Sequence, residues 1–221
     1  MEYPVIIVNF KTYKESTAET AVKLAKICEK VAKKTKKNII VAVQHSDIYR
    51  VSQAVKIPVF AQHVDTITAG AHTGHILAET VKQNGAVGTL INHSEHTLAL
   101  EVIQQTIARA KEAGLFTVVC AHDAKLAEKI AKFSPGCIAV EPPDLIGGKV
   151  SVSTAKPELI KNTVEKVNKV AAIPVLCGAG VQNSQDVKIA LQLGSKGILL
   201  ASGVVKAENP EQVLLDLVSV L

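Results

Sequence analysis

A carboxylate stands directly after an apolar run near the middle of the chain. Residues 137–153 read CIAVEPPDLIGGKVSVS, so Glu141 follows the apolar residues 138–140. Two prolines come next and fix the backbone that leaves the run, because proline cannot continue a strand ladder. An apolar pair, two glycines and a polar exit follow. This layout predicts either an ordinary surface loop or a lid at about residues 142–150 beside a general base, which would work better with water excluded.

Polar or very small residues also follow four other apolar runs. They are Asn9 and Lys11, then His93 and Glu95, then Gly178 and Gly180, and finally Ala201 and Ser202. A carboxylate base with an imidazole and a lysine suits proton abstraction next to a carbonyl, with the imidazole and lysine stabilising the enolate oxygen. Small residues with accessible backbone N–H groups suit a phosphate. Each group alone has a structural explanation, but together they predict proton transfer on a phosphorylated substrate.

The elements that position these residues alternate along the whole chain. Short apolar runs rich in β-branched residues predict strands at residues 5–10, 39–43, 59–61, 87–91, 117–121, 138–141, 175–177 and 197–200. Amphipathic patterns predict helices at residues 16–34, 47–54, 77–84, 97–113, 124–132, 157–169, 184–191 and 210–220. Eight strand–helix units without a linker predict one α/β domain over residues 1–221, a closed (β/α)8 barrel of parallel strands. Active sites of this fold lie at the carboxyl ends of the strands, where the residues above are placed.

The helix boundaries carry recognisable signals. Ser16, Asp47 and Ser184 are expected to cap three helix N-termini, because short polar side chains accept hydrogen bonds from the first free N–H groups. Gly85, Gly114 and Gly194 are expected just past three helix C-termini.

Composition narrows the class of protein. The chain has 221 residues, 48% hydrophobic and only 3% aromatic, which favours a core of Val, Ile, Leu and Ala. The net charge is +5, and many lysines fall in residues 30–37, read as a solvated helix end rather than a nucleic-acid surface. The four cysteines are widely spaced and predict buried thiols rather than a metal site or a disulfide framework. The N-terminal apolar run is too short for a signal peptide or a membrane span, so a cytoplasmic protein with no nucleic-acid or membrane partner is expected.

The motifs and their order resemble the triosephosphate isomerase family over the whole chain. They are N-F-K at 9–11, A-Q-H at 61–63, G-A-H-T-G at 70–74, H-S-E at 93–95, E-P-P-D-L-I-G-G-K at 141–149, G-A-G-V at 178–181 and A-S at 201–202. The resemblance implies interconversion of dihydroxyacetone phosphate and D-glyceraldehyde 3-phosphate in glycolysis and gluconeogenesis, without a metal or another cofactor. Glu141 would move the proton between two carbons, and His93 would polarise the carbonyl.

The resemblance assigns further roles. Lys11 would pair with the negative charge of the substrate, Asn9 would bind its oxygens, and Glu95 would stand behind Lys11. The phosphate would be held by backbone N–H groups at Ile146, Gly147, Gly178, Gly180, Ala201 and Ser202, the first two belonging to the lid.

Several features differ from the usual pattern of the family and resemble its shorter archaeal branch. His96 and Thr97 replace two arginines, the lid lacks its aromatic residue, Gly180 replaces a serine, and Ala201 and Ser202 replace two glycines. That branch implies a homo-oligomer, a homotetramer first and a dimer as the alternative. The long Gly- and Thr-rich loop over residues 63–75 would supply an interface, because a loop of that length needs a packing partner.

Three other functions remain open from the residues alone. Another phosphate-binding barrel, such as a pentose-phosphate epimerase or an indole-pathway isomerase, would need metal ligands or a different acid–base pair. A non-catalytic barrel could bind phosphorylated ligands, although Glu141, His93 and Lys11 are all present. The lysines of residues 30–37 leave RNA binding as a third alternative.

Overall fold

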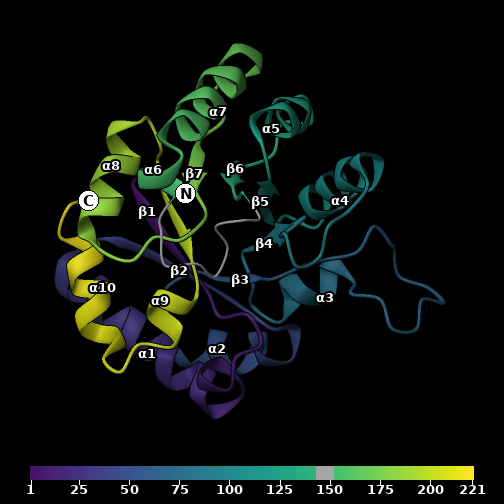
Figure 1. Ribbon diagram of the computed structural model, residues 1–221. Coiled ribbons are helices and arrows are strands. Elements are labelled where there is room, and N and C mark those ends of the chain that lie inside the picture. The colour runs from purple at the N-terminus through teal and green to yellow at the C-terminus, as the bar shows by residue number, and fades with distance from the viewer. Residues whose placement is uncertain (143–151) are drawn as a thin grey trace.

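Eight parallel strands close into one barrel in sequence order, β1 to β8, in the computed structural model, which describes residues 1–142 and 152–221 (Figure 1). The strands are β1 Val5–Asn9, β2 Asn38–Val43, β3 Val59–Ala61, β4 Gly88–Ile91, β5 Phe116–Ala121, β6 Cys137–Val140, β7 Val175–Cys177 and β8 Gly197–Leu200. β1 pairs with β8 from Val5 opposite Gly197 to Val8 opposite Leu200, which closes the ring. The predicted (β/α)8 fold is confirmed, and each strand lies within one residue of its expected position.

Helices follow the strands and form the outer layer (Figure 1). They are α1 Glu19–Thr35, α2 Ile48–Ala54, α3 Ala78–Gln83, α4 Leu100–Glu112, α5 Ala124–Ala131, α6 Val152–Ala155, α7 Pro157–Val170, α8 Ser184–Gln192, α9 Ser202–Val205 and α10 Pro210–Val218. Two short 3-10 helices, η1 Lys14–Ser16 and η2 His45–Asp47, precede α1 and α2. The sequence did not predict α6 and α9, because four residues are too few to show a helical period.

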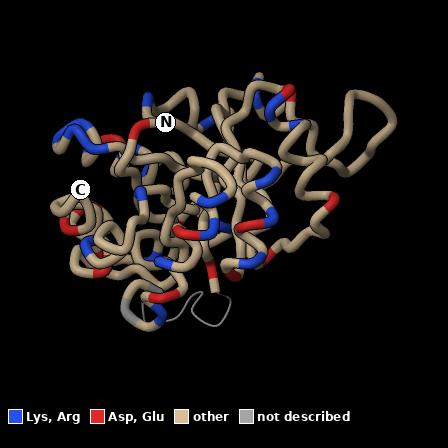
Figure 2. Tube along the Cα trace, turned by 90° about the horizontal axis from the view of Figure 1, so that it is seen from above, with Lys and Arg blue, Asp and Glu red and all other residues tan. Residues whose placement is uncertain are grey.

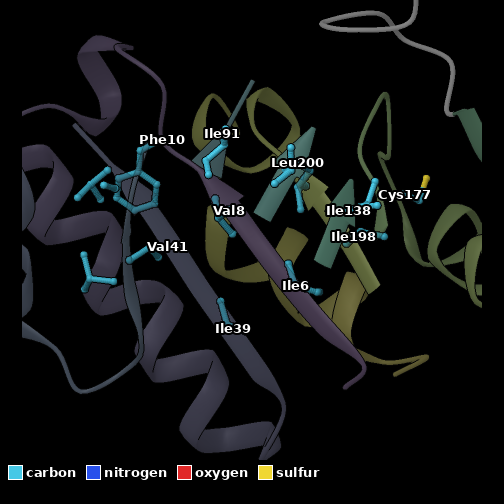
Figure 3. Packing of buried hydrophobic residues seen from close by; sticks show 14 of the residues in the cluster. Ile6, Val8, Phe10, Ile39, Val41, Ile91, Ile138, Cys177, Ile198 and Leu200 are labelled. Carbon is cyan, nitrogen blue, oxygen red and sulfur yellow. The ribbon is translucent and has the colours of Figure 1, made fainter. Parts of the chain in front are cut away.

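Strand residues divide alternately between two apolar layers. On β1, Val5 and Ile7 lie with the small cluster inside the barrel, whereas Ile6 and Val8 join the larger cluster between strands and helices. Figure 3 shows this outer layer, with Ile6 and Val8 along β1 and Ile39 and Val41 on the next strand. Burial on both faces explains why the strands read as continuous apolar runs rather than as alternating patterns.

The expected helix caps are only partly correct. Gly85, Gly114 and Gly194 do follow helices with positive φ angles of 99°, 72° and 95°. Ser184 is wrong as a cap, because Asn183 stands one residue earlier and accepts the Asp186 N–H at 3.0 Å. Ser16 is also wrong as a cap: it ends η1, and its hydroxyl donates to the Phe10 carbonyl.

Asp47 stands at the start of α2 but makes no capping hydrogen bond there. Its Oδ2 instead accepts the Ala18 N–H at 3.0 Å, at the beginning of α1. The carboxylate therefore satisfies the N-terminus of the neighbouring helix, a contact that spacing along the chain could not reveal.

Charged residues of both signs are interspersed over the molecule (Figure 2). Within the expected basic segment, Lys30 pairs with Glu211 of α10 at 2.8 Å and Lys33 with Glu29 at 3.1 Å. These pairs fit the prediction of a solvated helix end. Throughout residues 1–142 and 152–221, no helix is long and apolar enough to cross a membrane.

The loop between β3 and α3 projects beyond the outer layer of helices (Figures 1 and 2). Its two ends are tied together, because Asp65 N–H donates to the Ile76 carbonyl at 3.0 Å and Ile76 N–H donates to Asp65 Oδ2 at 2.6 Å. Arg109 of α4 binds the Ile67 carbonyl at 3.2 Å. The base of the loop is therefore fixed to the barrel, while residues 68–75 are exposed.

Candidate active site

Asn9 and Lys11 lie at the carboxyl end of β1 in a tightly bonded turn. Lys11 has a positive φ of 49°, a conformation that costs energy for a residue with a side chain. Asn9 Oδ1 accepts the Lys11 N–H at 3.0 Å, and Gln62 Nε2 donates to the Lys11 carbonyl at 3.0 Å. The same Gln62 amide lies 3.3 Å from Asn9 Oδ1. These contacts hold the strained backbone and so fix where the lysine side chain begins.

The loop after β4 carries His93 and Glu95. Lys11 Nζ forms an ion pair with Glu95 Oε1 at 2.7 Å, and the lysine side chain is only 10% exposed. Glu95 N–H donates to His93 Nδ1 at 3.1 Å. Because that backbone group is a donor, Nδ1 must accept, and the neutral ring carries its proton on Nε2.

Glu141 follows β6 and is 2% exposed. Its Oε1 lies 3.7 Å from His93 Nε2, so the carboxylate and the protonated nitrogen of the imidazole face each other. Gly178, directly after β7, packs against this carboxylate side chain. A Cβ atom built on Gly178 would lie 2.5 Å from Glu141 Cγ, so the position requires glycine.

A cleft at the carboxyl ends of the strands brings most of the predicted residues together. Its lining comprises Asn9, Lys11, His93, Glu141, Gly178, Ala179, Gly180, Val181, Gln182, Leu199, Leu200, Ala201, Ser202 and Gly203. Glu95 does not line this cleft but an adjoining one that also contains Lys11 and His93. Ile146 and Gly147, together with the lid from residue 143 onward, lie outside the described residues.

The small residues after β7 and β8 form the other side of the cleft. Gly180 has a positive φ of 68°, and Ala201 immediately precedes the short helix α9. Backbone N–H groups at a helix start and in a glycine turn suit an anion. This part of the cleft is therefore suited to a phosphate, next to the acid–base groups that follow β6 and β1.

Burial shifts the pKa values of Glu141 and His93 in opposite directions. Loss of water raises the pKa of Glu141 from 4.5 to about 7, and the Cys120 thiol, the Lys11 ammonium and the Ser94 N–H partly oppose this rise. Loss of water also lowers the pKa of His93 from 6.5 to about 4, and the positive charge of Lys11 adds to the decrease. Near neutral pH the site therefore combines a carboxyl group close to half ionisation with an uncharged imidazole.

Three residues around the site were given no role in the site by sequence reasoning. Gln62 lies within the recognised A-Q-H motif, Asn92 precedes the H-S-E motif, and Cys120 is the second-last residue of an apolar run. Their partners come from other strands, so motif spacing alone gave no signal for their contacts. His96 stands where the family usually has an arginine. Its ring packs on His63, with the ring centroids 4.3 Å apart.

Metal binding finds no support in the described part of the chain. No group of three or more His, Cys, Asp or Glu side chains within it is placed to hold a metal ion. All four cysteines are buried free thiols.

A closed parallel barrel whose strand ends present a carboxylate, an imidazole and an ammonium group to one cleft defines a (β/α)8-barrel enzyme of the acid–base type. Comparison with known proteins narrows this class. The sequence model described as triosephosphate isomerase matches residues 4–221. The triosephosphate isomerase of Methanobacterium bryantii is 51% identical over 219 residues, which cover 99% of this chain and 97% of the relative.

Two further archaeal triosephosphate isomerases are similar over comparable lengths. That of Methanothermobacter thermautotrophicus is 51% identical over 217 residues, covering 98% of this chain and 95% of the relative. That of Methanocaldococcus jannaschii is 47% identical over 214 residues, covering 96% and 98%. The chain belongs to the triosephosphate isomerase family and is an isomerase.

Proposed function

We propose that this chain interconverts dihydroxyacetone phosphate and D-glyceraldehyde 3-phosphate, in glycolysis and gluconeogenesis, and that Glu141 moves the proton between the two carbons. The observation that carries the proposed mechanism is the pairing of a buried carboxylate, with a pKa of about 7, and His93 Nε2 at 3.7 Å in one cleft. A base in this range can take a proton at neutral pH and return it. Triosephosphate isomerase is itself the standard example of a Glu base combined with a neutral His, so the pairing is expected for this family.

His93 polarises the carbonyl by donating from Nε2. The backbone N–H of Glu95 occupies Nδ1, which leaves Nε2–H as the donor toward the cleft. The low pKa of about 4 keeps the ring neutral, and a neutral imidazole can both give and regain a proton between the two substrate oxygens. Lys11 supplies positive charge for the developing enediolate, and Asn9 binds the substrate oxygens.

The phosphate group occupies the side of the cleft formed by Gly178, Gly180, Ala201 and Ser202. Binding of the phosphate fixes the reacting carbons relative to Glu141 and His93, which lowers the entropic part of the barrier.

A coupled assay of the purified chain with D-glyceraldehyde 3-phosphate tests this proposal. We expect fast turnover in the wild type and a loss of about 10³-fold or more in kcat for Glu141→Ala, because the general base is removed. Glu101→Gln, an exposed position on α4, serves as the control and should keep full activity. Turnover of Glu141→Ala close to that of the wild type would exclude Glu141 as the base. A folded wild type without turnover that still bound inorganic phosphate would instead favour a non-catalytic phosphate-binding barrel.

We further propose a cytoplasmic homo-oligomer, a homotetramer or otherwise a dimer, in which the loop over residues 63–75 contacts a second copy. The fixed base of this loop and its exposed tip support an interface, because little ordering entropy would be lost when the tip packs. Four free thiols support a reducing compartment.

A further inference from the structure

Asn92 occupies an unusual position at the carboxyl end of β4. It is 7% exposed and has a positive φ of 59°. Asparagine tolerates this conformation better than most residues with a Cβ atom, although glycine would adopt it at lower cost. An amide side chain kept at such a position indicates that its hydrogen bonds compensate for the backbone energy.

Both ends of the Asn92 amide are used. Its Nδ2 donates to the Cys120 carbonyl of β5 at 2.8 Å, and its Oδ1 accepts the Leu98 N–H at 2.8 Å. The second bond brings the two ends of the loop over residues 93–97 together. His96 N–H also donates to the His93 carbonyl at 2.7 Å, so the loop folds back on itself.

This loop contains three groups that act on the proposed chemistry. His93 faces Glu141, Glu95 pairs with Lys11, and the Ser94 N–H favours the ionised form of Glu141. On the other side of the amide, the Cys120 thiol also favours the ionised carboxylate. Asn92 thus joins the loop that carries His93 to the end of β5, where the Cys120 thiol acts on Glu141.

We propose that Asn92 is a positioning residue for this isomerisation, whose side-chain amide fixes the loop over residues 93–97 against the end of β5 and thereby sets the geometry between His93 and Glu141. The inference rests on the proposed roles of His93 and Glu141. A pocket of about 70 Å³ is lined by Asn92, Ser94, Thr97, Cys120, Ala121, His122 and Glu141. Loss of the amide would enlarge this space and let the loop shift away from β5.

Two variants separate the contribution of the Asn92 side-chain amide from that of its backbone conformation. Asn92→Gly retains the positive φ and removes both hydrogen bonds. Asn92→Asp retains the acceptor for the Leu98 N–H but sets an oxygen against the Cys120 carbonyl. We expect kcat to fall on the order of 10- to 100-fold in both, because displacement of catalytic groups by about 1 Å costs that much. The dissociation constant of inorganic phosphate should stay unchanged, since the phosphate side of the cleft belongs to β7 and β8.

The pH profile provides a readout that loss of stability alone would not change. Lys11, His93, Glu95 and Cys120 act on Glu141 or face it, and His122 lines the same pocket. All five titratable groups stay in both variants. We expect the acid limb of kcat/KM to move to higher pH in both variants. The reason is that displacing the Ser94 N–H and the Cys120 thiol removes support for the ionised carboxylate. The added charge of Asn92→Asp should shift the limb further in the same direction.

Thr117→Val is the matched control, because it removes a buried hydrogen bond at the opposite end of β5. Thr117 Oγ1 accepts the Gly136 N–H at 2.9 Å, away from the cleft. The control should lower the free energy of unfolding without changing kcat or the pH profile. The proposal is overturned if Asn92→Gly keeps kcat within about twofold of the wild type with the same acid limb. It is also overturned if Thr117→Val loses kcat to the same extent as Asn92→Gly.

If Asn92→Gly does not fold, the kcat and the acid limb of Asn92→Asp test the proposal in the same way. Wild-type turnover and its loss in Glu141→Ala are measured in parallel. An inactive wild type would contradict the proposed function, whereas an active wild type with an equally active Asn92→Gly would contradict this inference alone.

Discussion

Glu141 carries a charge that its surroundings disfavour. Its side chain is almost fully buried, and removal from water raises its pKa to about 7. The same burial that prepares the base therefore reduces the stability of the folded chain whenever the carboxylate is ionised. Catalytic competence and stability oppose each other at this residue.

Glu141→Gln should remove that cost. Because the folded-state pKa lies above the ordinary value, the wild type loses stability as the pH rises from about 4.5 through about 7. We expect the variant to exceed the wild type by up to roughly 3 kcal/mol in free energy of unfolding at pH 8, with the difference vanishing near pH 4.5. Urea unfolding at both pH values measures this difference, with Glu101→Gln as the control. A variant no more stable than the wild type at pH 8 would show that Glu141 does not bear this penalty.

Gly178 acts at the same scale through its missing side chain. A methyl group there would meet Glu141 Cγ at 2.5 Å, so Gly178→Ala should push the carboxylate away from His93. We expect kcat to fall on the order of 100-fold, because the base would be displaced by about 1 Å. Steady-state kinetics measure the loss, and circular dichroism checks the fold. Gly70→Ala, where the nearest atom lies at 3.4 Å, should remain active. Equal activity of both variants would mean that the site adjusts around the added methyl group.

At the scale of elements, the start of α8 shows that the residue that caps a helix can lie one position away from the residue that the sequence predicts. Asn183 and Ser184 are both good capping residues, and Asn183 takes the role because its side chain reaches the Asp186 N–H. Ser184 is used differently, since its hydroxyl donates to Asp216 of α10 at 2.9 Å. Ser184, which capping propensity alone would make the cap of α8, thus joins α8 to α10 instead.

Asn183→Ala should therefore destabilise α8 directly. Loss of the cap is expected to lower the free energy of unfolding by about 1 kcal/mol, because one buried donor at the helix start loses its partner. Thermal or urea unfolding checks this, with the exposed Gln185→Ala as the control. A change below that of Gln185→Ala would assign the start of α8 to another residue.

At the scale of the whole molecule, the barrel forms only when the first and last strands pair. β1 and β8 are separated by nearly the entire chain, and their pairing brings Lys11 into the same cleft as Ala201 and Ser202. The proposed substrate would touch both ends of the chain, so the site exists only in the closed barrel.

The proposed oligomer is testable at this scale. Replacing residues 68–74 by a short Gly–Ser linker leaves the ties at Asp65, Ile67 and Ile76 in place. We expect the assembly to become smaller, because the exposed tip would no longer contact a second copy. Light scattering after size-exclusion chromatography measures the mass. An unchanged mass would place the subunit interface elsewhere on the surface.

Much of the fold could be predicted from the sequence. Apolar runs mark strands buried on both faces, and alternation with amphipathic helices leaves the closed barrel as the consistent topology. The same pattern places Asn9, Lys11, His93 and Glu141 at strand ends, because each lies at the end of an apolar run or within two residues of it. These properties are local, so the order of residues along the chain is enough to determine them.

Only the tertiary structure decided how those residues work together. Several contacts join residues of different strands, and the spacing of strands along the sequence does not predict them. They are the contacts of Gln62 with Lys11, of Asn92 with Cys120 and of Gly178 with Glu141. The pKa shifts of Glu141 and His93 likewise arise from burial and from charges that only the closed barrel brings near. Hydration and Coulomb interactions depend on distance in space, and for this site that distance is set by the pairing of strands around the ring.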